Sequence, residues 1–417
     1  MPCGAVRRQG NWEDTVPVGT AFHERTFALC ESLNYREWSG YYTVGVYEMH
    51  HEHEYNAIRN SAALIDISPL FKYRVTGRDA TKFVNRVITR DVNKVAAGQV
   101  IYGCWCDPEG KVIDDGTITR LGENEYRWTA ADPSLRWFRQ NALGLEVTIE
   151  DISESVAALA LQGPTSGRLL QAVAEAEIAN LKYFRVTHGK IAGVPVDISR
   201  TGYTGDLGFE IWMPWQDAVK VWDELMGKGR AWDIHPAGMI ALDIARIEAG
   251  LILIEVDYFS SKKALIEEQK YSPAEIGLGK LVDLKKESFV GREALLREQK
   301  TGAARALVGL EIDWTEVEER YEKMGLAPQV PGTASRVAVP VYCPGRGGKQ
   351  AGKATSTTWS PTLKRMIALA SVAREYSEPG TVLQMELTVE AVRQAVAAKV
   401  VALPFFNPKR KTAVPVL

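Results

Sequence analysis

The chain has 417 residues, of which 46% are hydrophobic and 24% charged, and its formal net charge is -2 at pH 7. The composition is typical of a globular protein, and the length suffices for two or three domains. A near-neutral charge speaks against a nucleic-acid partner and gives no reason to expect an anionic membrane partner.

Other bulk features favour the cytoplasm as the location. No stretch approaches the roughly 20 apolar residues of a membrane span. The N-terminal residues 1–8 lack the apolar core of a signal peptide. The five cysteines are an odd number without a disulfide-like spacing, which suits a reducing compartment.

The predicted elements of the first 300 residues alternate between helix and strand. Residues 1–40 form an extension, expected as an arm on the body. A helix over 53–63 has Tyr55, Ile58, Ala62 and Ala63 along one face. Further helices are expected at 79–88 (with Asp79 as N-cap), 134–143 and 165–173, and strands at 70–76, 100–106, 112–120, 126–130 and 156–161. This alternation predicts α+β layers over residues 41–300.

The remaining part, residues 301–417, has a different character. Strands are expected at 308–312, 337–342, 366–370, 382–389 and 396–403, with turns between them. They predict a C-terminal β-barrel or β-sandwich domain. The charged stretch 315–326 is expected to form a surface helix.

The segment Arg200-Thr-Gly-Tyr-Thr-Gly-Asp-Leu-Gly-Phe-Glu-Ile-Trp212 has the features of a ligand loop. Strands are expected on both sides, at 194–199 and 209–213. A dinucleotide-binding glycine loop must open a helix, so NAD is rejected. Alternation places Glu210 on the opposite face from Phe209 and Ile211, where a carboxylate suits the N–H donors of an amino-pyrimidine. The alternative is a glycine turn with a solvated Glu210.

Further segments accompany this loop in a fixed order. They are Thr89-Arg-Asp-Val92, Gly98-Gln-Val-Ile-Tyr102, Asp107-Pro-Glu-Gly-Lys-Val-Ile-Asp-Asp115, Ala241-Leu-Asp-Ile-Ala-Arg-Ile-Glu-Ala-Gly250, Phe289-Val-Gly-Arg-Glu-Ala-Leu295 and Gly352-Lys-Ala-Thr-Ser356. In this order the chain, over roughly residues 40–408, resembles the glycine cleavage T-protein family of folate-dependent aminomethyltransferases and their demethylase relatives. The resemblance implies three subdomains around a central folate channel, with tetrahydrofolate as cofactor.

The resemblance also suggests roles for individual residues. Asp114 and Asp115 are strand neighbours that point to opposite faces, so they form no shared-proton dyad. The family points to Asp115 as the acid beside folate N5–N10, with a pKa raised by an apolar pocket. Asp114 is grouped with the cofactor-binding residues, although one of the pair could be solvated or cap a turn. The alternative for both is an acidic pair that flanks a turn at a solvent-exposed edge.

Four more residues join the expected folate site. Glu210 would accept hydrogen bonds from the pterin amino and N3–H edge. Tyr102 and Tyr203 would supply stacking area or a hydroxyl. Arg246 is either the i+3 ion-pair partner of Asp243 or, by resemblance, a residue that orders the site.

A substrate site is expected near the aromatic residues Trp38, Tyr42 and Trp105, since aromatic faces attract sulfonium and ammonium groups. Core packing is the alternative for at least half of the clustered aromatic residues, which also include Tyr41 and Trp128. His50 and His53 could share a metal at i,i+3 spacing, but a solvated helix start is favoured, and no metal is expected.

The chain departs from the T-protein pattern at three places. Leu242 stands where the family has arginine, Pro69 where it has histidine, and 254–258 replaces a typical turn. These changes favour demethylation of a small S-, N- or O-methylated compound, giving 5-methyltetrahydrofolate. The alternatives are aminomethyl transfer from a lipoyl carrier protein in a glycine cleavage system, and a folate-binding protein without turnover.

Overall fold

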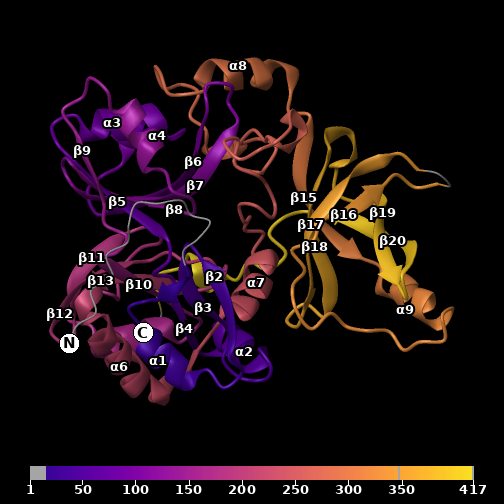
Figure 1. Cartoon of the computed structure of the whole chain (residues 1–417), viewed down its shortest axis with the longest axis horizontal. Coiled ribbons are helices and arrows are strands. Elements are labelled where there is room, and N and C mark those ends of the chain that lie inside the picture. Colours follow the sequence, from indigo (N-terminus) through magenta and orange to yellow (C-terminus); the bar gives the residue numbers. More distant parts are fainter. Residues whose placement is uncertain (1–15, 346–347, 416–417) are drawn as a thin grey trace.

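The computed structural model describes residues 16–345 and 348–415. In this part of the chain, a three-stranded, a five-stranded and a six-stranded sheet accompany a closed six-stranded barrel. The barrel stands to one side, and helix α7 (Met239–Glu248) lies between it and the sheets (Figure 1). The α+β class and the C-terminal barrel are therefore confirmed.

The six-stranded sheet has the order β11-β12-β13-β10-β4-β14. One face carries Leu159, Phe209 and Ile211 into a core closed by Trp222. Its strands are β4 (Ala62–Asp66), β10 (Val156–Gln162), β11 (Val186–Ile191), β12 (Val194–Ser199), β13 (Gly208–Pro214) and β14 (Ile234–Pro236), and α5 (Ser166–Val173) and α6 (Ala218–Gly229) complete the unit.

The helix expected over 53–63 is shorter than predicted. Helix α2 spans Glu52–Asn60, and Ala62 and Ala63 begin β4 instead. Tyr55 and Ile58 are buried on this helix as expected. The two alanines pair with β10 and β14, because long-range strand pairing outweighs local helical spacing.

The five-stranded sheet has the order β6-β7-β8-β5-β9. Trp105, Trp128, Phe83 and Phe138 form the centre of its core. Asp79 is no side-chain cap; its carboxylate accepts from the Glu146 amide at 2.8 Å instead. The elements are β5 (Phe71–Thr76), β6 (Gln99–Cys106), β7 (Val112–Gly122), β8 (Glu125–Ala130), β9 (Thr148–Asp151), α3 (Ala80–Val87) and α4 (Leu135–Asn141).

The described part of the N-terminal extension packs closely on the body. Phe22 is fully buried, with its ring 5.7 Å from Trp222, and Arg25 pairs with Asp223. The elements are β1 (Val18–Gly19), α1 (His23–Leu29), β2 (Asn34–Trp38) and β3 (Tyr41–Val46), and β2 pairs with β3 across residue 40. Residues 1–15 of the predicted arm lie outside the described residues.

The barrel has the order β15-β18-β17-β16-β19-β20. Its strands are β15 (Arg305–Ile312), β16 (Val339–Tyr342), β17 (Gln350–Ser360), β18 (Arg365–Ala373), β19 (Val382–Val389) and β20 (Val392–Val401), and α8 (Arg292–Thr301) precedes it. The predicted surface helix is α9 (Trp314–Glu322), capped by Asp313. Strand β17 was not among the predicted strands. No helix of the described residues combines the length and apolarity needed to cross a membrane.

Lys72 joins the two large sheets, and its removal should lower stability. Its buried Nζ donates to the carbonyls of Ser68 at 2.6 Å, Leu70 at 2.8 Å and Ser153 at 3.2 Å. Lys72→Met leaves these carbonyls without their donor, so we expect a loss of about 1–3 kcal/mol in the free energy of unfolding. Chemical denaturation measures it, with exposed Lys82→Met as control. Equal effects of the two variants would contradict the role of Lys72.

Candidate functional site

Polar side chains of the two large sheets and of two adjoining loops meet in one layer. Arg127 on β8 pairs with Asp197 on β12 at 2.5 Å, and its guanidinium lies 4.5 Å from the Trp212 ring on β13. The residues of this polar layer are Tyr102, Asp115, Arg127, Ser199, Thr201, Tyr203, Glu210 and Tyr258. On β7, β8 and β13 these residues alternate with side chains of the apolar cores. The layer therefore lies between the two cores.

Asp115 is held by two tyrosines. The Tyr102 hydroxyl donates to its Oδ2 at 2.6 Å, and the Tyr258 hydroxyl donates to its Oδ1. Burial raises the pKa of Asp115, and the two hydrogen bonds oppose that rise. The carboxyl is thus oriented and able to hold a proton nearer to neutral pH, in the direction expected from the sequence.

Asp114 lies on the other face of β7 and has a structural role. Its carboxylate accepts from the amides of Asp115, Ala131 and Asp132 at 2.7–3.1 Å, and the side chain is fully buried. Burial, followed by the nearby Asp115, raises its pKa. The assignment of Asp114 to cofactor binding is corrected, because the carboxylate fixes the turn after β8.

Glu210 faces the polar layer from β13, while Phe209 and Ile211 point into the core as alternation predicts. Its Oε2 accepts from the Thr201 hydroxyl at 2.7 Å. Burial raises the pKa of Glu210, and Thr201 and Arg127 oppose the rise. This mostly buried carboxylate can accept hydrogen bonds from further N–H donors.

The glycine loop between β12 and β13 is fixed from several sides. Gly205 has φ +72°, and a Cβ there would lie 2.4 Å from the Ala249 side chain, so glycine is required. The Tyr203 hydroxyl donates to the Ile252 carbonyl. Arg410 from the C-terminal segment makes two hydrogen bonds to Asp206, at 2.6 and 2.8 Å. The loop leads into a strand, as predicted.

Arg246 on α7 is buried in a network that reaches the barrel. Its Nη1 donates to Asp257 at 2.6 Å and its Nη2 to the Ser356 hydroxyl of β17 at 2.8 Å. Asp257 also accepts from Thr355 at 2.5 Å. The ion pair with Asp243, at 3.6 Å, is the longer contact. Because Tyr258 follows Asp257 directly, Arg246 helps to position the tyrosine that holds Asp115.

Arg127 of the polar layer, and Asp257 and Tyr258 beside Arg246, had no predicted role. Tyr258 and Asp257 were noted only within an unusual segment, and Arg127 was not singled out. The signal for Asp257 and Tyr258 was the polar and aromatic pair inside the altered segment 254–258. Their contacts are to residues distant in the chain, which spacing alone does not reveal.

The predicted substrate residues lie in different surroundings. Trp105 is fully buried, with its ring 5.2 Å from Trp128 and 5.7 Å from Phe138, so its assignment to substrate contact is corrected to core packing. Trp38 packs partly buried against the same apolar cluster as Tyr203. Tyr42 lies 6.1 Å from the His23 ring. Contact of Trp38 and Tyr42 with a substrate stays a prediction.

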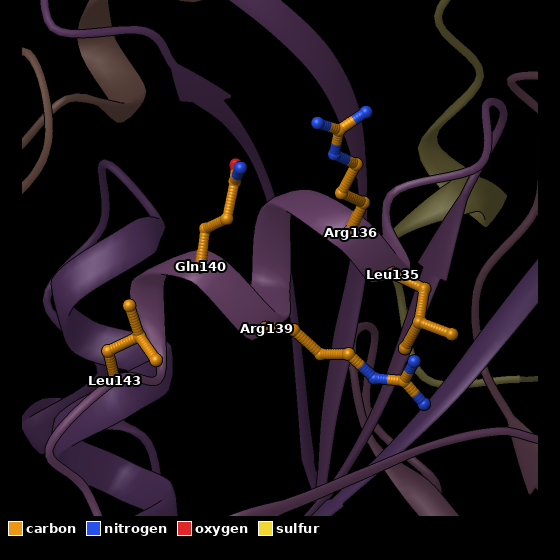
Figure 2. A pocket seen from close by; sticks show the side chains of 5 residues that line it. All are labelled: Leu135, Arg136, Arg139, Gln140 and Leu143. Atoms are coloured by element: carbon orange, nitrogen blue, oxygen red, sulfur yellow. The ribbon is translucent and has the colours of Figure 1, made fainter.

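Two other features lie away from the polar layer. His53 contacts Glu48 at 2.8 Å on the exposed surface. A surface hollow on α4 is lined by Leu135, Arg136, Arg139, Gln140 and Leu143. Figure 2 shows Arg136 and Gln140 extending from one side of the helix and Arg139 from the other. None of these residues contacts Asp115 or Glu210 through a hydrogen bond or ion pair in the described structure.

Comparisons with known proteins agree with this architecture. Residues 21–286 match the model of the GCVT N-terminal domain, and residues 305–407 match that of the glycine cleavage T-protein C-terminal barrel domain. The aminomethyltransferase of Halalkalibacterium halodurans is 35% identical over 85% of this chain and 89% of its own length. The glycine cleavage system aminomethyltransferase T of Bartonella henselae has the same fold, with TM-score 0.77, 22% identity and coverage of 93% and 98% of the two chains.

A relative with another activity also matches. The trimethylamine-oxide aldolase of Ruegeria pomeroyi is 34% identical over 97% of this chain, which spans about half (49%) of that protein. With two family models that together cover most of the residues, the chain belongs to the folate-dependent glycine cleavage T-protein family and is a transferase of one-carbon groups.

Proposed function

We propose that the chain binds tetrahydrofolate in the polar layer and demethylates a small S-, N- or O-methylated compound to give 5-methyltetrahydrofolate. The observation that carries the proposal is the placement of Asp115 and Glu210 in one layer. Tyrosine hydroxyls orient the first carboxyl, and the Thr201 hydroxyl orients the second.

The groups of the layer fit a reduced pterin. The pterin amino group and N3–H are neighbouring donors, and the mostly buried Glu210 carboxylate can accept from both. Bound tetrahydrofolate supplies a nucleophilic nitrogen that takes up the one-carbon unit. Asp115 would hold the proton that the transfer requires, and Tyr102 and Tyr258 would keep its carboxyl in one orientation.

Two observations support a methylated donor. The match to the trimethylamine-oxide aldolase, whose name denotes a small N-methylated compound, covers 97% of this chain, against 85% for the Halalkalibacterium halodurans aminomethyltransferase. Leu242 and Pro69 also replace residues typical of T-proteins. The second candidate is aminomethyl transfer from a lipoyl carrier, supported by the 35% identity to that aminomethyltransferase.

One experiment separates the two candidates. The pure protein is incubated without oxygen with tetrahydrofolate and a panel of methylated sulfonium, ammonium and aryl-ether compounds, and the folates are read by mass spectrometry. We expect 5-methyltetrahydrofolate from one donor class. Methylenetetrahydrofolate formed only with an aminomethyl-lipoyl carrier would favour the second candidate. Folate binding without product from any donor would indicate a binding protein.

Glu210→Ala should weaken tetrahydrofolate binding by about tenfold or more, since it leaves buried pterin donors without an acceptor. Calorimetry measures the dissociation constant. The control is Glu311→Ala on the barrel, where the carboxylate is 37% exposed and pairs with Arg365. Equal affinities of the Glu210 variant and the unchanged protein would remove Glu210 from the pterin site.

A further inference from the structure

Arg127 is a buried cation with most of its hydrogen-bonding capacity unused. Its side chain is 5% exposed, and its Nη1 donates a hydrogen bond to Asp197 at 2.5 Å. Nε and Nη2 are buried and have no hydrogen-bond partner among the described residues. Leaving charged donors unpaired in the interior is costly, so a bound ligand that supplies an acceptor for these two nitrogens would be stabilised, since residues 16–345 and 348–415 supply none.

The unused nitrogens form a recognisable edge. Nε and Nη2 lie on one side of the planar guanidinium and donate in parallel, the geometry with which arginine reads carbonyl groups on heterocycles. Stacking on the Trp212 ring at 4.5 Å and the Asp197 ion pair hold the plane in place. The edge is therefore fixed before any ligand arrives.

Arg127 lies close to Glu210 without pairing with it. Each group influences the other through its charge, yet no direct ion pair joins them in the described residues. Register explains the proximity: Asp197 is opposite Trp212, and Ser199 is opposite Glu210, so the partners of Arg127 lie two residues from Glu210 on the same face. An anchored donor edge and an anchored carboxylate thus stand near each other in the polar layer.

We infer that Arg127 donates hydrogen bonds to the 4-oxo group of the pterin, next to the N–H groups that donate to Glu210. Arg127 thereby selects oxo-pterins over 4-amino analogues. The inference rests on the proposed folate function. A pterin presents amino, N3–H and O4 in sequence along one edge, so two donors are followed by an acceptor. Glu210 and Arg127 supply the complementary acceptor and donor. In a 4-amino analogue an amino group would face the guanidinium.

The test is a comparison of two ligands. Dissociation constants for tetrahydrofolate and its 4-amino-4-deoxy analogue are measured by anaerobic calorimetry for the unchanged protein and for Arg127→Met. We expect the unchanged protein to prefer tetrahydrofolate, and Arg127→Met to reduce that preference by about tenfold or more. A role in stability alone would weaken both ligands equally and leave their ratio unchanged.

Controls keep the outcomes distinct. Arg74→Met replaces an exposed arginine in register with Arg127 on β5, and its ratio should equal that of the unchanged protein. Arg127→Lys keeps a cation beside Asp197 but lacks the planar edge, so it should also lose the preference for tetrahydrofolate. It takes the place of Arg127→Met in the test if that variant does not fold. If a folded Arg127 variant binds tetrahydrofolate and the ratio of the two dissociation constants is unchanged, the role of Arg127 is overturned, while the proposed function stands. Failure of the unchanged protein to bind tetrahydrofolate overturns the proposed function with it.

Discussion

Replacement of Asp115 by asparagine is expected to lower kcat by about 10²–10⁴-fold, the usual contribution of a positioned acid or base. Asparagine keeps the shape of the side chain and can still accept from one tyrosine hydroxyl, but it cannot exchange a proton. Tetrahydrofolate affinity should change little, because the pterin contacts are assigned to Glu210 and Arg127. Single-turnover kinetics with the donor found in the panel, together with calorimetry, measure the two quantities.

The tyrosines provide matched variants for this prediction. Tyr102→Phe and Tyr258→Phe each remove one hydrogen bond that lowers the pKa of Asp115, so that pKa should rise further. Asp115 would then stay protonated to higher pH, and the limb of the kcat–pH profile that reports its titration should shift to higher pH. Unchanged product formation by Asp115→Asn would exclude the carboxyl from proton transfer.

The sequence could predict features that depend on local period. Alternation along 209–213 placed Glu210 opposite its apolar neighbours, and the structure confirms that placement. Five of the six barrel strands were also recognisable, because each contains a short β-rich run between turns, whereas β17 was not predicted. Alternation also separated Asp114 from Asp115, since strand neighbours face opposite ways.

Alternation could not tell what each face of a strand meets. Trp105 and Tyr102 are both aromatic residues on β6, yet Trp105 enters a core of aromatic rings while Tyr102 meets Asp115. The contact of Tyr258 with Asp115 spans 143 residues, and that of Arg246 with Ser356 spans 110. Such pairs depend on how sheets, helix α7 and barrel pack together, which local patterns do not encode.

The Arg246–Asp257 pair should have the largest effect on stability. Both side chains have no solvent exposure, and their charged atoms are 2.6 Å apart. Arg246→Met leaves the Asp257 carboxylate buried without its cation, so we expect a loss of about 3–5 kcal/mol in the free energy of unfolding. Arg336→Met is the matched control, because Arg336 pairs with Asp243 from a position 36% exposed, and its loss should cost less than about 1 kcal/mol.

A double variant separates the two roles considered for Arg246. Arg246→Met with Asp257→Asn removes both charges, and we expect it to regain most of the stability that the single variant loses. Its tetrahydrofolate affinity should then lie within a few fold of the unchanged protein, because three of the contacts that fix Arg246 are to Leu251, Asp257 and Ser356. Its kcat should be lower than that of the unchanged protein, since Tyr258 loses the network that positions it. A stable double variant without tetrahydrofolate binding would instead place the Arg246 guanidinium in direct contact with the cofactor.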